Sequence, residues 1–184
     1  MDEITKLMVE QLRDAHSAEK QAVRVAQRMA KTATNERLRE GFQMHAEQTE
    51  GQIERVAQAL EQLGAKPGRK VCEAMRGLIE EAQHEMGDAE KGAMMDVIII
   101  AAAQRIEHYE IAAYGTMATL AKSAGMKELG DLLGQTLDEE KRMDAMLTEI
   151  AEREVNMAFI EEARAMQEEG ANENKRGASR KKAS

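Results

Sequence analysis

The sequence predicts an all-α protein, and three features of its composition lead to this prediction. The chain has 184 residues, of which 42% are apolar and 33% are charged, so it can bury one core and stay in solution. Aromatic residues make up 2% and there is one proline, which argues against a β-sandwich or barrel because strands favour aromatic and β-branched residues. The dominant residues are instead those with high helix propensity, such as alanine, glutamate, methionine and leucine.

Apolar residues recur every three or four positions in four long segments, which predicts four long helices. The segments are residues 3–31, 35–63, 94–122 and 127–153. Thr34-Asn35 can cap the second helix, Gly64 and Pro67 end it, and Gly125 separates the last two helices. A shorter amphipathic segment, residues 156–169, predicts a short C-terminal helix.

The lengths of the connections predict how these helices are arranged. A short loop joins the first two helices and another joins the last two, so each pair forms an antiparallel hairpin. The link from Gly64 to Met94 contains a short helical stretch, Val71 to Met86, and its roughly 30 residues can run the length of a helix. Two hairpins joined by one long crossover predict a ferritin-like four-helix bundle, which we assign to residues 1–169.

The charge distribution bears on partners and location. The net charge of -8 disfavours nonspecific binding of nucleic acid by the main body. Residues 170–184 form a basic tail that we expect to be disordered, with contact to DNA phosphates as a minor alternative to a role in solubility. Cys72 is the only cysteine, and neither a signal peptide nor an apolar run long enough for a bilayer is visible. We therefore expect a cytoplasmic protein without membrane contact.

Acidic residues near the middle of the four long helices lie where apolar side chains are expected. Glu19, Glu107 and Glu140 fall in the centre of the apolar face of their helices, and Glu50 lies nearer the edge of such a face. Because all four are near mid-helix, they can meet at one level of the bundle. Ionised carboxylates in an apolar interior are strongly unfavourable, so they must be protonated or bind a polyvalent cation.

Three further acidic residues lie within one turn of this set and enlarge the predicted ligand group: Glu54, Glu110 and Asp144. Glu47 is an alternative to Glu54 on the second helix. Oxygen ligands from facing helices suit iron or manganese, and carboxylate centres with two metal ions are built in the cores of such bundles. The sequence therefore predicts a site for two metal ions, with iron preferred and manganese as the alternative.

A second interpretation is that buried acidic residues pair with basic ones. The basic residues nearest in sequence directly follow or precede the acidic ones, as Lys20 follows Glu19 and Arg55 follows Glu54. Neighbours in a helix point about 100° apart, which weakens this interpretation. His16 and His108 can border the site but are more expected at the surface, and His45 lies at the edge of the second helix.

Four blocks of the sequence resemble the YciE/YciF family of ferritin-like bacterial proteins: Leu12–Gln21, His45–Arg55, Ala101–Gly115 and Thr136–Lys141. The blocks occur in the same order as in the family, and the likeness covers residues 3–160. The resemblance implies a rubrerythrin-like four-helix bundle that forms a homodimer in the bacterial cytoplasm and acts in stress responses.

Wider ferritin-like di-iron proteins carry a Glu on the first and third helices and Glu-x-x-His on the second and fourth. By this resemblance the principal ligands are Glu19, Glu50, Glu107 and Glu140. Ile53 and Met143 stand at the two His positions, so Glu54 and Asp144 are the expected substitutes. The implied function is iron oxidation or peroxide handling at a di-iron centre. The alternative is a non-catalytic, dimeric stress or assembly protein with a degenerate metal site.

Overall fold

This computed structural model describes the backbone of residues 2–181 and the side chains of residues 2–171. The described residues contain six α-helices and one short π-helical turn. In chain order they are α1 (Glu3–Thr32), α2 (Glu36–Gln62), α3 (Glu73–Asp88), α4 (Ala93–Ser123), α5 (Lys127–Ile150), η1 (Ala151–Val155) and α6 (Asn156–Lys181). The prediction of an all-α protein is confirmed.

Side chains and glycines at the helix ends set these boundaries. The Asp2 carboxylate accepts a hydrogen bond from the Thr5 backbone N–H at 2.9 Å and caps α1. Asn35 caps α2 in the same way, accepting from the Leu38 N–H at 3.0 Å. Gly64 and Gly125 follow α2 and α4 with φ angles of 69° and 78°, a left-handed conformation that glycine adopts without steric cost.

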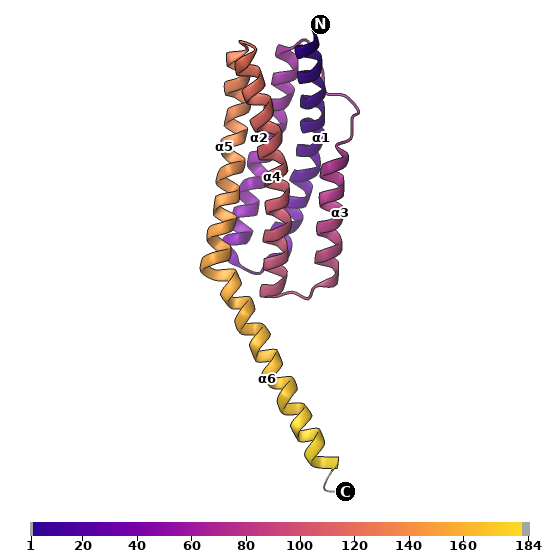
Figure 1. The fold of residues 1–184 in the computed structure, drawn as a ribbon, viewed down its shortest axis with the longest axis vertical. Helices are drawn as coiled ribbons and strands as arrows, with labels where there is room; N and C mark the ends of the chain where they lie inside the picture. The colour runs from indigo at the N-terminus through magenta and orange to yellow at the C-terminus, as the bar shows by residue number, and fades with distance from the viewer. Residues whose placement is uncertain (1, 182–184) are drawn as a thin grey trace.

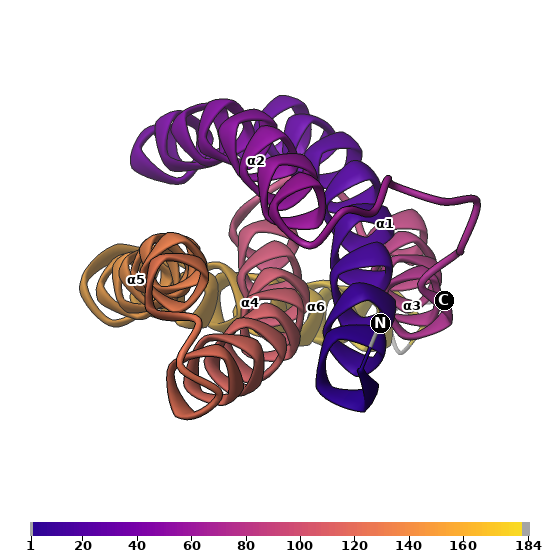
Figure 2. The same ribbon diagram turned by 90° about the horizontal axis from the view of Figure 1, so that it is seen from above.

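Two antiparallel hairpins, α1–α2 and α4–α5, pack together as a four-helix bundle (Figure 1). The crossover from α2 to α4 contains α3, which packs outside the bundle against α1 and α4 (Figure 2). This crossover returns the chain along the bundle, so α2 and α4 run in the same direction. The predicted ferritin-like topology is confirmed. None of the described helices is long and apolar enough to cross a membrane.

A layer of polar side chains divides the apolar core of the bundle into two clusters. Phe42 and Leu147 belong to the cluster near the α1–α2 loop. Leu12 and Leu133 belong to the cluster near the opposite end. Between them lie buried polar residues from all four bundle helices: Glu19, His45, Thr49, Gln52, Glu107, Glu110, Thr136 and Glu140. We refer to these residues as the polar layer.

The chain leaves the bundle after α5 through η1, and α6 extends away from it (Figure 1). This differs from the predicted short helix over residues 156–169 followed by a disordered tail, because the backbone stays helical through Lys181. Alanine, glutamate, lysine and arginine past residue 169 favour helix, and no proline stops it. The side chains of residues 172–184, and with them the predicted DNA contact, lie outside the described residues. The division into bundle and tail stays a prediction.

Candidate metal centre

The centre of the polar layer is a compact group of carboxylates with one imidazole. A ligand atom from each of His45, Glu107, Glu110 and Glu140 lies within 4.8 Å of the others. The His45 Nε2 atom is 3.2 Å from Glu107 Oε1 and 3.8 Å from Glu140 Oε2. Glu19, from α1, completes the acidic group and is also fully buried. Side chains from all four bundle helices therefore meet at one level.

In two of these carboxylates, one oxygen accepts a hydrogen bond from a neighbouring polar side chain. The Tyr114 hydroxyl donates a hydrogen bond to Glu19 Oε1. The Gln52 amide donates to Glu140 Oε1, and also to Glu139 Oε2 at 3.0 Å. The remaining oxygen of Glu19 and that of Glu140 have no hydrogen-bond partner. Each carboxylate is thus held in place through one oxygen and leaves the other free to bind a ligand.

Unpartnered polar atoms gather in this group. Among residues 2–171, the buried side-chain nitrogen and oxygen atoms without a hydrogen-bond partner are Glu19 Oε2, His45 Nδ1, Gln52 Oε1, Glu107 Oε2, Glu110 Oε1 and Glu140 Oε2. An unpartnered buried polar group costs about 1–3 kcal/mol, so such groups are rare in native proteins. Nearly all of these atoms are oxygens that can donate an electron pair. A cation would satisfy several of them at once.

Burial also opposes the charge of these carboxylates. It raises the pKa of Glu19 to about 8, with a further contribution from the charge of Glu140, and it raises the pKa of Glu107 to about 8. The pKa values of Glu110 and Glu140 are likewise raised well above the ordinary value, by burial first and by the neighbouring carboxylates second. Among the described residues, no lysine or arginine forms an ion pair with these four, and Arg55 instead pairs with Glu139 at 2.9 Å. Pairing with lysine or arginine therefore does not compensate their charge.

The structure places the sequence-predicted ligands in two environments. It brings Glu19, Glu107, Glu110 and Glu140 together in the polar layer. Asp144 lies at the rim, where it accepts a hydrogen bond from Gln104 at 3.0 Å and contacts the exposed His108 at 3.3 Å.

Glu50 and Glu54 differ from the expectation, because both are exposed on the outer side of α2, as is the alternative, Glu47. The reason is the rotation of α2, which turns His45, Thr49 and Gln52 inward. Glu50 follows Thr49 directly and so points about 100° away from the core. The apolar positions Ala46 and Ile53 predict a different buried face for this helix.

Sequence reasoning missed the contributions of His45, Gln52 and Tyr114. A signal for the first two is present, because Leu38, Phe42 and Val56 are fully buried and His45, Thr49 and Gln52 continue their alternating spacing of four and three residues. This spacing indicates the side of the helix that faces the core, even though the residues in the middle of the series are polar. Tyr114 has no comparable signal, since a buried tyrosine at helical spacing is also typical of an ordinary core.

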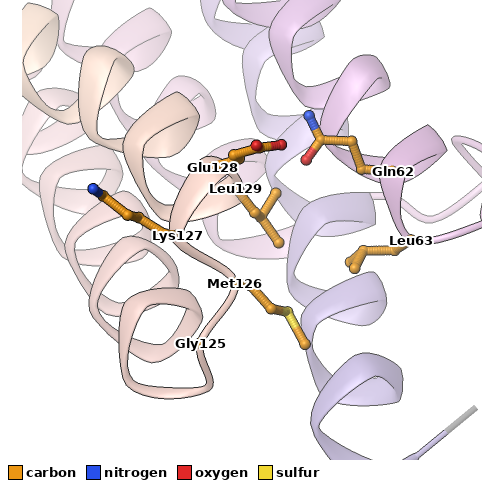
Figure 3. A pocket seen from close by; sticks show the side chains of 7 residues that line it. All are labelled: Gln62, Leu63, Gly125, Met126, Lys127, Glu128 and Leu129. Carbon is orange, nitrogen blue, oxygen red and sulfur yellow. The ribbon is translucent and has the colours of Figure 1, made fainter.

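A pocket lies elsewhere, at the end of the bundle where α2 stops and α5 starts (Figure 3). Its volume is about 540 Å³, and it is lined by Gln62, Leu63, Gly125, Met126, Lys127, Glu128 and Leu129. The charged groups of Lys127 and Glu128 point in different directions and do not converge on one point (Figure 3). The side chains that could together hold a metal ion lie in the polar layer and not in this pocket.

Comparison with known proteins relates the chain to characterised folds. The protein YciF of Escherichia coli K12 is 45% identical over 157 residues, which cover 85% of this chain and 95% of YciF. The crystal structure of the E. coli stress protein YciF matches with a TM-score of 0.80, covering 85% of this chain and 99% of that one. YcfI from Rhodopseudomonas palustris matches with a TM-score of 0.76 and 38% identity, over 80% of this chain and 94% of YcfI.

More distant structures share the fold alone. A ferritin-like, diiron-carboxylate protein from Bacillus anthracis matches with a TM-score of 0.63 and 18% identity, over 82% of this chain and 99% of that one. The sequence family described as a domain of unknown function, DUF892, matches residues 3–160, the whole bundle and the start of α6. On this match and the identity with YciF, the chain belongs to the DUF892 family.

Proposed function

We propose that the polar layer binds metal ions and that the chain is a ferritin-like stress-response protein. The observation that carries this proposal is the gathering of buried, unpartnered oxygen atoms from four helices at one place. The related protein from E. coli is described as a stress protein, which supports the same role here. The fold supports it as well, since bundles of this topology hold carboxylate metal sites between facing helices.

The donor set suits iron, with manganese as the alternative. Carboxylate oxygens favour hard cations, and the imidazole of His45 is a ligand that iron also accepts. Two divalent ions would balance the charge of the four carboxylates Glu19, Glu107, Glu110 and Glu140. Bound iron would supply the chemistry for iron oxidation or for the removal of peroxide. The residues of the chain would hold the ions and keep the site dry within the bundle.

Metal analysis of the purified protein tests this proposal. We expect protein prepared with added iron to retain metal by elemental analysis, and Glu107→Gln and Glu140→Gln to lose most of it. The matched control is Glu40→Gln, which changes an exposed carboxylate on α2 that has no part in the layer. Glu50→Gln and Glu54→Gln distinguish the ligand set expected from the sequence from the set brought together in the fold. Wild-type protein with only trace metal would refute the proposal.

The alternative function is a non-catalytic dimeric bundle whose metal site is degenerate. The raised pKa values of Glu19 and Glu107, about 8, favour it, because both carboxyls could persist as neutral acids near neutral pH. Assaying peroxide consumption by metal-loaded protein separates the two functions. Turnover that is lost in Glu140→Gln supports a catalytic centre, and metal binding without turnover supports a passive role.

We also propose a homodimer in the bacterial cytoplasm. Two large apolar side chains one turn apart on α6, Met157 and Ile160, are exposed, as is typical of a surface that contacts another chain. Light scattering coupled to size exclusion measures the mass in solution. A mass of one chain at micromolar concentration would contradict the dimer.

A further inference from the structure

The second half of α1 presents only positive charge to the solvent. In residues 15–31 the one acidic side chain is Glu19, which is buried in the polar layer. Lys20, Arg24 and Arg28 are exposed and follow one another at intervals of four residues. They therefore lie on one side of the helix, about 6 Å apart along its axis. The chain has 34 acidic and 26 basic residues, so this side of α1 reverses the overall balance of charge.

The segment between α2 and α3 borders this side of α1. It loops outward beside the helix and then returns to it (Figure 1). The Arg13 guanidinium donates a hydrogen bond to the Lys66 carbonyl at 3.2 Å, and the Cys72 N–H donates to the Ser17 hydroxyl at 3.0 Å. These contacts fix both ends of the loop on α1. A recess of about 240 Å³ lies between the loop and the helix, and its charged lining residues are Lys20, Arg24, Arg69 and Lys70.

A second recess, of about 210 Å³, continues the first along α1 and reaches α3. Its lining includes Arg28 from α1 and Gln83 from α3. Gln21 and Arg24 line both recesses, so the two are adjacent. No carboxylate lines either of them. We refer to the basic residues of the two recesses as the basic groove: Lys20, Arg24, Arg28, Arg69 and Lys70.

Most charges of the basic groove are not neutralised by the protein. Four of its five residues form no ion pair within the described part of the chain: Lys20, Arg24, Arg28 and Arg69. The fifth, Lys70, contacts Asp14 at 3.6 Å. On α3, Glu73 and Glu80 pair with Arg76 of the same helix instead of with the groove. Like charges four residues apart destabilise a helix, and an anion bound between them would remove this cost.

The arrangement of the groove indicates the kind of anion. Guanidinium groups bind phosphate through two parallel hydrogen bonds, and Arg24 is placed to reach into both recesses. Several positive charges in a row match several linked anionic groups better than a single one. The recesses are small, and the net charge of -8 opposes a long polyanion such as DNA. A short phosphate chain satisfies each of these conditions.

We propose that the basic groove binds a small molecule with a linear chain of two or three phosphate groups, with Arg24 at the centre of the site. This inference goes beyond the proposed function and does not depend on metal in the polar layer. The phosphate chain is the recognised group. It is common to inorganic tripolyphosphate and to a nucleoside triphosphate, and binding measurements with both probes distinguish these two sources.

Calorimetric titration of the metal-free protein with inorganic tripolyphosphate, near physiological salt and with a chelator present, tests the inference. We expect tripolyphosphate to bind at least tenfold more tightly than inorganic phosphate. Arg24→Gln should weaken binding at least tenfold, whereas Arg24→Lys, which keeps the charge but not the planar fork, should weaken it less. The matched control is Lys141→Gln, which removes an exposed charge on α5 and should change binding by less than twofold. Circular dichroism of each variant verifies that the helices are intact.

Adenosine triphosphate identifies the source of the phosphate chain. Tighter binding than tripolyphosphate supports a nucleotide, and equal binding supports recognition of the phosphate chain alone. Equal affinity for tripolyphosphate and inorganic phosphate, or equal losses in Arg24→Gln and Lys141→Gln, would overturn the inference. So would the absence of tripolyphosphate binding at millimolar concentration, including the case in which duplex DNA binds through Arg24. None of these results bears on metal binding, since the titration is carried out without metal.

Discussion

Replacing Glu107 with glutamine should stabilise the metal-free protein near pH 8. The folded chain holds the pKa of Glu107 at about 8, against 4.5 as the ordinary value, because the carboxyl is buried. Between these values the folded state keeps a proton that the unfolded state has released. Stability of the wild type therefore falls as pH rises through this window, and the neutral amide of the variant removes that loss.

The magnitude follows from the same shift. At about 1.4 kcal/mol per pKa unit, the rise from 4.5 to about 8 corresponds to at most about 5 kcal/mol of unfolding free energy. Loss of the Glu107 contact with His45 offsets about 1–3 kcal/mol of this. We expect a net gain of about 2 kcal/mol near pH 8. Near pH 5 the gain from the raised pKa is absent, so the variant should be less stable than the wild type by about 1–3 kcal/mol, the contribution of the lost contact.

Urea denaturation in the presence of a chelator, followed by far-UV circular dichroism, measures the effect. The exposed variant Glu40→Gln makes the same change of charge and should show no such pH dependence. If the wild type grew more stable as pH rose from about 5 to 8 without metal, the carboxyl would not be a buried acid with a raised pKa. A Glu107→Gln variant less stable than the wild type at both pH values would refute the reasoning in the same way.

Three further predictions concern stability. Asp96 accepts hydrogen bonds from the backbone N–H groups of Thr34 and Asn35 at 2.8 Å, so Asp96→Ala should cost about 2–4 kcal/mol in urea denaturation, with Asp96→Asn closer to the wild type. Glu162 on α6 accepts from the Ala93 N–H at 3.1 Å, at the start of a helix that has no side-chain cap of its own; Glu162→Ala should cost about 0.5–2 kcal/mol, and no loss would show that this contact does not hold α6. Metal at a hundred times its dissociation constant should stabilise the folded state by about 2.7 kcal/mol in thermal unfolding, and Glu140→Gln should abolish this gain.

The fold could be predicted from the sequence because its signals are local and repeated. Helix formers fill the long segments, and Asn35, Gly64 and Gly125 mark ends that the structure places within one or two residues. The length of the crossover then limits the topology to two joined hairpins. The end of α6 could not be predicted in this way, since nothing in the residues past 169 distinguishes a disordered tail from an extension of the helix.

The site could be predicted in part. Glu19, Glu107 and Glu140 are flanked by apolar residues on both sides of one face, so their burial follows from helical periodicity. On α2 the periodicity is ambiguous, because Ala46 and Ile53 suggest one face and Leu38 and Phe42 suggest another. Packing against α1 and α5 selects the second face, and that choice depends on contacts distant in sequence.

The polar layer also constrains the fold itself. Sliding any one of the four helices by a turn would move a carboxylate or an imidazole into one of the two apolar clusters, beside residues such as Leu12 or Leu147. That misplacement is costly, whereas apolar residues exchanged for one another along a uniform core would be tolerated. We infer that the layer sets the axial alignment of α1, α2, α4 and α5, so that the residues whose burial is costly also favour a single arrangement of the helices.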